Sequence, residues 1–270
     1  MPEQAKPLPV SSSEPPRFAA EQEKLFRDVL SILNDRKIPY VVSGAFALHE
    51  HTGIWRDTKD LDIFMPADQV SPTMDILRAH GFETELCDPV WLCKAKHGEY
   101  FVDLIAGMSN AVIRVDDSWI SRAFDSEVLG VPAKVLAPEE LIASKIFVAF
   151  RERFDGADIA HIVYAAGNTM DWSRLIALVG DHWEVLLWSL VFFHYVYPSS
   201  NAVPMLIWEE LLEKLENDLQ NPDQKAPFRG SLLDEKMFAI DVHEWKLQNV
   251  VAGYRDKAEP KVGEVREPAA

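Results

Sequence analysis

Apolar and charged residues alternate along the first half of the chain with the spacing of short helices and strands. Residues 19–35 carry apolar side chains three and four positions apart with charged residues between them, which predicts an amphipathic helix. Pro39 should end that helix, because proline disfavours a helical residue ahead of it. The β-branched run 40–42 predicts a strand. Further strands are expected at 61–65, 82–86, 91–94, 100–105 and 133–136, and further helices at 45–51 and 71–80.

The pattern changes at Pro138, after which helical spacing dominates. Proline and acidic side chains suit the first turn of a helix, so Pro138, Glu139 and Glu140 are typical of a helix start. Helices are expected at 140–153, 157–166, 172–179, 183–197, 205–219 and 233–253. We therefore predict an α+β fold, in which a small mixed β-sheet core with flanking helices is followed by an all-helical C-terminal unit.

Both ends of the chain have the composition of flexible tails. Five prolines and three serines fall within residues 1–16, and residues 257–270 are polar and hold two prolines. We therefore divide the chain into a disordered tail over 1–16, an α/β core over 17–137, a helical domain over 138–256 and a flexible tail over 257–270.

The charge balance of the 270 residues is strongly acidic. Lys and Arg total 27 against 43 Asp and Glu, a formal net charge of −16 at pH 7. Proteins that coat phosphate backbones or dock on anionic membranes need a basic face, so extensive nucleic-acid contact and membrane binding are both disfavoured. With 48% hydrophobic and 26% charged residues, the composition is that of a globular protein.

Cysteine usage and hydropathy favour a cytoplasmic protein. Cys87 and Cys93 are too few for a disulfide framework, and their spacing matches no zinc site. The N-terminal residues lack the pattern of a signal sequence. The most apolar run, 185–197, is shorter than the roughly 20 residues of a membrane span and is interrupted by Ser189 and His194, so it predicts a buried helix.

The candidate chemistry lies in two aspartates at the start of a predicted strand. Asp60 and Asp62 are two residues apart, so both side chains project from the same face. Two carboxylates side by side repel unless a cation or proton lies between them, and Mg²⁺ takes such ligands together with substrate phosphates. Asp103 interrupts the apolar strand 100–105 in the same way. Three carboxylates on neighbouring strands would hold two Mg²⁺ ions for in-line phosphoryl transfer.

A phosphate site is expected beside these carboxylates. Ser43 and Gly44 form a turn between a strand and a helix, where glycine allows close approach of the backbone and the helix N-terminus favours an anion. Arg56 and Lys59 are candidates for neutralising phosphate charge, with ordinary surface charge as the alternative. Lys145 lies among apolar residues and either points into a cleft to bind the nucleotide or extends its ammonium group to solvent.

The order of these elements resembles the DNA polymerase β-type nucleotidyltransferase superfamily. A small residue and Gly44 after an apolar strand, then Asp60 and Asp62, then Asp103 in a later strand follow the pattern of that superfamily. The run Arg56 to Asp62 is similar to its small bacterial members, namely abortive-infection toxin-like proteins and antibiotic nucleotidyltransferases. The resemblance covers roughly residues 38–106, with weaker similarity over 136–162.

The resemblance implies a role for each matching residue. Asp60 and Asp62 match the metal-ligand pair, and Asp103 matches the third carboxylate, which holds the second metal and helps deprotonate the acceptor hydroxyl. Ser43 and Gly44 match the turn that touches the nucleoside triphosphate. The implied reaction transfers a nucleoside monophosphate to an acceptor hydroxyl and releases pyrophosphate. The acidic net charge favours a small molecule or a protein as the acceptor.

Two other functions remain open on the sequence alone. Some glycosyltransferases also use an Asp-x-Asp pair with a metal, but they usually have a longer nucleotide-binding half before the motif than the 59 residues that precede Asp60 here. A nucleotidyltransferase fold that only binds a partner is the third hypothesis. The presence of all three aspartates argues against it.

Overall fold

The computed structural model describes residues 14–56, 58–258 and 262. Contacts within the chain divide these residues into two compact units, and the first boundary falls between Ala137 and Pro138. One unit holds the described residues up to Ala137 together with those from Tyr254 onward, and the other holds Pro138–Gly253. The predicted tails fall mostly outside the described residues.

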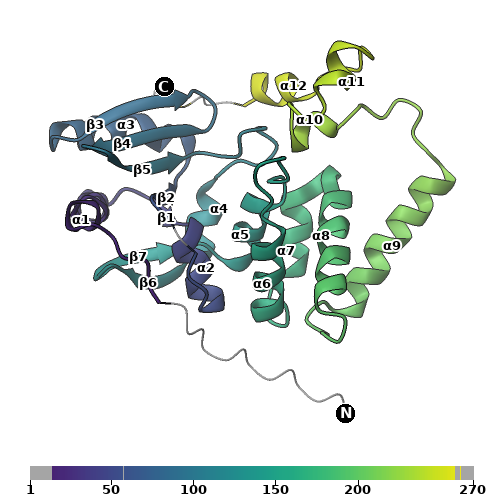
Figure 1. The fold of residues 1–270 in the computed structure, drawn as a ribbon, viewed down its shortest axis with the longest axis horizontal. Coiled ribbons are helices and arrows are strands. Elements are labelled where there is room, and N and C mark those ends of the chain that lie inside the picture. Colours follow the sequence, from purple (N-terminus) through teal and green to yellow (C-terminus); the bar gives the residue numbers. More distant parts are fainter. Residues whose placement is uncertain (1–13, 57, 259–261, 263–270) are drawn as a thin grey trace, which may run out of the picture. The chain divides into compact units, whose positions relative to one another are not determined.

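The first unit is built on one mixed sheet of seven strands (Figure 1). The strands are β1 Val41–Val42, β2 Leu61–Phe64, β3 Glu83–Asp88, β4 Leu92–His97, β5 Tyr100–Ile105, β6 Phe124–Val128 and β7 Val131–Val135. Their order across the sheet is β3-β4-β5-β2-β1-β7-β6. Strand β2 is parallel to β5 and β1 is parallel to β7, while the other neighbouring pairs are antiparallel. The predicted mixed sheet is confirmed.

Helices cover this sheet and bury its apolar side chains. They are α1 Ala20–Asp35, α2 Gly44–Thr52, α3 Ala67–Ala79 and α4 Asp117–Arg122. Helix α1 packs on β5 and β7 and also contacts α3, while α2 contacts β2 and β7. The face that α1 buries includes Leu25, Phe26 and Val29, which are at most 2% exposed. Burying such side chains stabilises the unit by about 1.5–3 kcal/mol each.

Two features of this unit differ from the sequence prediction. Helix α3 begins at Ala67 instead of residue 71 and contains Pro72 in its interior. Packing outweighs the lost backbone hydrogen bond there, because Val70, Met74 and Leu77 are all buried on one face. The short helix α4 and the edge strand β6 were not predicted, since short elements of this kind carry little periodic signal.

The second unit is helical, as predicted. Its helices are α5 Pro138–Lys145, α6 Gly156–Ala166, α7 Trp172–Val179, α8 Trp183–Val196, α9 Met205–Gln220, α10 Gly230–Leu233 and α11 Ala239–His243, and α12 Val251–Asp256 follows at its end. Helix α8 packs against α6, α7 and α9, and α5 packs against α6 and α7. The C-terminal part of the fold is therefore a helical assembly without strands among the residues described in it.

Two predicted helices of this unit are wrong in extent. The helix expected over 140–153 ends at Lys145, and the chain turns back so that Asp155 donates its backbone N–H to the Val148 carbonyl at 3.1 Å. The helix expected over 233–253 is broken at Asp234. The carboxylate of Asp234 accepts backbone N–H groups of Lys236 and Met237, which replaces helical hydrogen bonding with a local turn.

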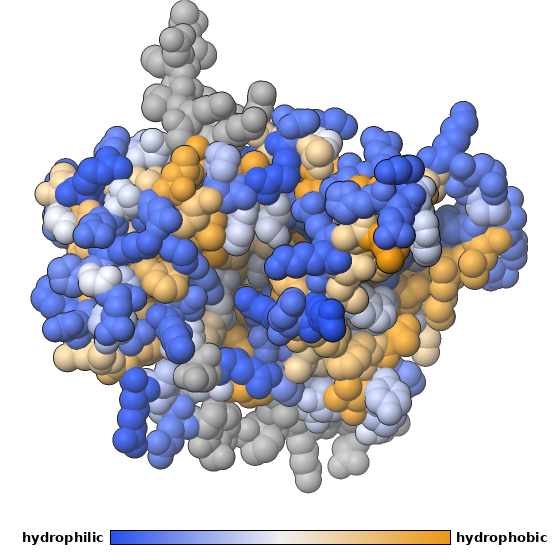
Figure 2. Space-filling model, turned by 45° about the horizontal axis from the view of Figure 1, so that its top comes forward, coloured by the Kyte–Doolittle hydropathy of each residue, from blue (hydrophilic) through white to orange (hydrophobic). Residues whose placement is uncertain are grey.

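The stretch Trp172–Val196, which includes α7 and α8, is long and apolar enough by composition to cross a membrane, and 39% of its most apolar window is buried in the structure. The core helices of soluble proteins share this length and composition, so the stretch by itself does not indicate a membrane span. The predicted buried helix is exposed on one side, where Val191 is 51% and Tyr195 84% exposed. Figure 2 shows apolar side chains gathered on the right of that view, where Figure 1 places α8 and α9.

Candidate active site

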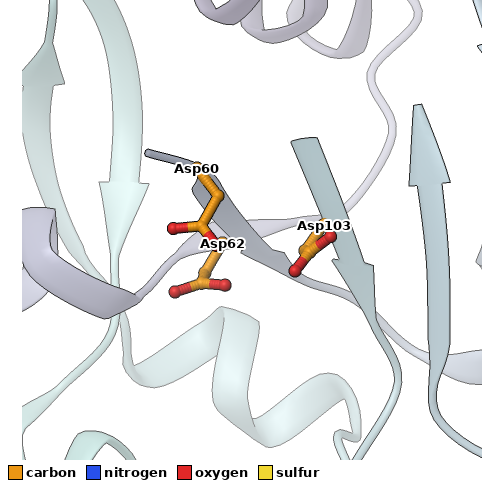
Figure 3. A group of neighbouring side chains, drawn as sticks. All are labelled: Asp60, Asp62 and Asp103. Carbon is orange, nitrogen blue, oxygen red and sulfur yellow. The ribbon is translucent and has the colours of Figure 1, made fainter. Parts of the chain in front are cut away.

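Three aspartates from two neighbouring strands come together in the first unit. Asp60 immediately precedes β2, Asp62 lies within it, and Asp103 lies in β5. Because β2 and β5 are parallel and in register, Asp62 stands directly opposite Asp103. One carboxylate oxygen of each residue lies within 4.8 Å of the other two (Figure 3). The structure therefore gathers the three carboxylates that the sequence analysis singled out.

Local hydrogen bonds fix the approach to β2. The Thr58 hydroxyl donates to Asp60 Oδ1 at 2.9 Å and also contacts the Asp60 carbonyl at 3.2 Å. Gln22 of α1 donates its side-chain N–H to the Lys59 carbonyl at 2.9 Å. These contacts tie the turn before β2 to α1 and hold the Asp60 carboxylate beside Asp62.

The turn between β1 and α2 lies against the same carboxylates. The Ser43 backbone N–H donates to the Asp62 carbonyl at 2.9 Å, and Ser43 is buried. Gly44 has a φ of +60°, and a Cβ atom on it would stand 2.1 Å from Asp62 Oδ2. Only glycine fits this conformation and this approach. The first turn of α2 is therefore placed next to Asp62.

Lys94 of β4 forms an ion pair with Asp103. The two residues face each other in the antiparallel β4–β5 pair. Burial raises the pKa of Asp103 above its ordinary value, and the charge of Asp60 acts in the same direction, while Lys94 acts to lower it. Sequence reasoning missed Lys94. The two-residue turn Gly98-Glu99 could have indicated it, because this turn sets the register of the β4–β5 hairpin and so pairs position 94 with position 103.

The three carboxylates suit a hard divalent cation. Their oxygens are crowded within 4.8 Å, and like charges at that separation repel unless a cation lies among them. Oxygen ligands from Asp are those that Mg²⁺ prefers. Gly44 leaves room for Asp62 Oδ2, because a Cβ atom at position 44 would stand 2.1 Å from this oxygen. The donor set thus fits the metal that the sequence analysis expected.

The three basic residues predicted to bind the nucleotide lie in different parts of the chain. Lys59 is exposed and directly precedes Asp60, and Arg56 is half-buried in the same connection. Lys145 ends α5 in the helical unit, where it is buried. Its Nζ lies 2.9 Å from Asp155 Oδ2 and 3.0 Å from Asp158 Oδ2. Lys145 therefore does not extend to solvent.

Asp155 also accepts hydrogen bonds from the Arg153 guanidinium at 2.8 and 2.9 Å. Burial acts to raise the pKa of Asp155, but Arg153 and Lys145 together outweigh it and hold the pKa below its ordinary value. This cluster pairs a buried lysine with a buried aspartate inside one unit, so neither charge is left without a partner in the interior.

A family model described as "Nucleotidyl transferase of unknown function (DUF2204)" matches residues 22–176. A comparison with curated proteins found no match. The match spans the strands and helices that carry Asp60, Asp62 and Asp103, and it extends into α7 of the helical unit.

Solved structures with similar chain traces are distant. The antibiotic-resistance factor ANT(2'')-Ia in solution is 17% identical, with a TM-score of 0.43 covering 66% of this chain and 99% of that chain. The lincosamide antibiotic adenylyltransferase LnuA, bound to lincomycin, is 16% identical, with a TM-score of 0.38 covering 54% and 98%. JHP933 from Helicobacter pylori is 16% identical, with a TM-score of 0.38 covering 76% and 100%. These likenesses carry no functional inference.

Proposed function

This chain belongs to the family of nucleotidyl transferases of unknown function (DUF2204), and we propose that it transfers a nucleoside monophosphate from a nucleoside triphosphate to an acceptor hydroxyl with the help of Mg²⁺. The observation that carries the proposal is the gathering of Asp60, Asp62 and Asp103 within 4.8 Å.

Asp60, Asp62 and Asp103 would hold the metal, with two ions expected. When bound, Mg²⁺ neutralises phosphate charge and polarises the α-phosphate. Asp60 offers its carboxylate from the position just before β2, Asp62 from within β2 and Asp103 from β5. Their fixed positions supply the electrostatic preorganisation on which phosphoryl transfer depends.

The bond changes are those of an in-line displacement. The acceptor hydroxyl oxygen bonds to the α-phosphorus of the triphosphate, and the bond from that phosphorus to the bridging oxygen of pyrophosphate breaks. The hydroxyl proton passes to Asp103, whose side chain stands across from Asp62. Pyrophosphate leaves with the electron pair of the broken bond.

The triphosphate would lie at the start of α2. The Ser43-Gly44 turn lies against Asp62, so the N-terminal amides of this helix would be available to a phosphate beside that carboxylate. We assign Ser43 and Gly44 to that contact, with Arg56 and Lys59 as cations for phosphate oxygens. The nucleotide contact expected of Lys145 stays a prediction, and within its own unit this lysine pairs with Asp155 and Asp158.

We propose a small molecule or a protein as the acceptor. A net charge of −16 disfavours a long nucleic-acid acceptor, because such a ligand needs a basic face to bind. A single hydroxyl on a small molecule or a protein side chain needs no such face.

The proposal is tested by the binding of a nonhydrolysable triphosphate. Wild-type protein should bind it in Mg²⁺ and lose most of that binding in EDTA or in Asp60→Asn. Asp125→Asn is the matched control, because Asp125 belongs to the same unit and its side chain is 91% exposed. Equal binding by wild type and Asp60→Asn, with and without Mg²⁺, would overturn the proposal.

A further inference from the structure

Three charged residues form a row across three adjacent strands. Lys94 of β4 is in register with Asp103 of β5, and Asp103 is in register with Asp62 of β2. Directly opposite residues project to the same face of a sheet, and in an antiparallel pair such as β4–β5 their Cβ atoms are about 4.5–5.5 Å apart. The sheet itself therefore sets a cation beside the third carboxylate of the candidate metal site.

Lys94 is held in this place by two contacts. Its ammonium pairs with Asp103 Oδ1. The same Nζ lies 3.7 Å from the centroid of the Phe101 ring, a distance at which the ring attracts a cation. Phe101 precedes Asp103 by two residues in β5, so both partners lie on one face of that strand. The Lys94 side chain is 21% exposed, which distinguishes it from an ordinary surface lysine.

We propose that Lys94 is a positioning residue that holds Asp103 and competes with metal for it. This inference rests on the proposed function, since it concerns the same carboxylates. In the protein without metal, the ammonium of Lys94 neutralises Asp103 and fixes the rotamer of its carboxylate. A metal ion that uses Asp103 must share this carboxylate with Lys94 or displace it.

The summed charge of Lys94 and the three aspartates determines how many metal ions the site can hold without nucleotide. Three carboxylates and one ammonium leave two negative charges, which a single divalent cation balances. A second divalent cation would then meet an electrostatically neutral site next to an ammonium, and its binding is unfavourable until a triphosphate adds negative charge. Lys94 thereby makes the loading of the second metal depend on the nucleotide.

Mn²⁺ binding followed by electron paramagnetic resonance tests this role without any turnover. Wild type should bind one Mn²⁺ alone and a second only with a nonhydrolysable triphosphate. Lys94→Met should bind the first Mn²⁺ about tenfold more tightly and take up the second without nucleotide, because the competing charge is gone. Lys94→Gln should behave in the same way. Lys94→Arg, which keeps the charge, should restore the dependence on nucleotide.

Lys96→Met is the matched control. Lys96 lies two residues further along β4, on the same face, and pairs with Glu85 instead of the site aspartates. The Lys96→Met substitution removes the same formal charge as Lys94→Met and should leave Mn²⁺ binding unchanged. Thermal unfolding of each variant establishes that the fold is retained.

The two proposals fail in different ways. Mn²⁺ binding by wild type that is no stronger than that of Asp60→Asn would overturn the proposed function and this inference together. If wild type binds Mn²⁺ and both Lys94→Met and Lys94→Gln bind it with the same affinity and stoichiometry as wild type, the role of Lys94 alone is overturned. A change in Lys96→Met as large as that in Lys94→Met would also overturn it, because net charge would then explain the effect.

Discussion

Gly44 lies so close to Asp62 that a methyl group on its α-carbon would stand 2.1 Å from Oδ2 of that carboxylate. The backbone of Gly44 also has a φ of +60°, in the left-handed region. Both features place the first turn of α2 against Asp62 of β2. The contact therefore couples the proposed phosphate turn to the proposed metal ligand.

We predict that Gly44→Ala displaces Asp62 and lowers nucleotidyl transfer by about 100-fold, since a misplacement of about 1 Å at a reacting centre costs that much. The left-handed backbone should also destabilise the fold by roughly 1–2 kcal/mol. Gly81→Ala is the control, because Gly81 has a φ of +90° with nothing within 4 Å of an added Cβ. Thermal unfolding and transfer rates measure both effects. Equal activity in the two variants would contradict the contact.

The pH dependence of metal binding should reflect the burial of Asp103. Burial raises the pKa of Asp103, so a proton competes with metal for this carboxylate at a higher pH than for an ordinary aspartate. As the pH falls through that raised pKa, Mn²⁺ affinity should decrease. A titration of Mn²⁺ affinity against pH checks this, with Asp103→Asn as the comparison. Identical acid limbs in wild type and Asp103→Asn would show that Asp103 does not set the limb.

The buried cluster around Lys145 should stabilise the helical unit. Lys145→Met leaves the buried Asp155 and the half-buried Asp158 without their shared ammonium, and breaking such a pair costs about 3 kcal/mol. Lys214→Met is the control, because Lys214 forms an exposed pair with Glu210 and should cost less than about 0.5 kcal/mol. Denaturant unfolding compares the two. Equal losses would contradict a special role for the cluster.

The same cluster should weaken in acid. The pKa of Asp155 is held below its ordinary value, so the stability that this group contributes is present above the ordinary pKa of an aspartate. That contribution is lost as the pH falls through the lowered pKa of the folded state. The difference in unfolding free energy between wild type and Lys145→Met should therefore shrink at acid pH. A difference that grows as the pH falls would contradict this sign.

The sequence predicted the features that depend on local pattern. Strand β5 has the predicted bounds, because its apolar run is interrupted only by Asp103. The two-residue spacing of Asp60 and Asp62 predicted that their carboxylates lie side by side, and the structure brings both together with Asp103. The α+β fold is confirmed for the same reason, since strands and helices alternate before Pro138 and only helices follow it in the described part of the chain.

The features that were missed depend on contacts between distant residues. Lys94 became part of the site only through the register of β4 with β5, which a reading of single elements does not supply. Helix α5 ends at Lys145, whose ammonium pairs with Asp155 ten residues later, after the chain has turned back. Asp234 breaks a helical pattern because its carboxylate bonds to the backbone, including the N–H of Arg151 at 3.1 Å. The spacing of apolar residues does not predict such pairings between distant residues.

The central claim is that Asp60, Asp62 and Asp103 perform metal-dependent nucleotidyl transfer. Its most direct test is the transfer of label from an α-³²P nucleoside triphosphate to a panel of hydroxylated small molecules and proteins, with pyrophosphate release measured in parallel. Wild type and Asp125→Asn should show Mg²⁺-dependent transfer. Asp62→Asn should lose it by more than about 100-fold, because changes to residues that only support metal ligands already cost 10- to 100-fold. Transfer by Asp62→Asn at the wild-type rate would contradict the account.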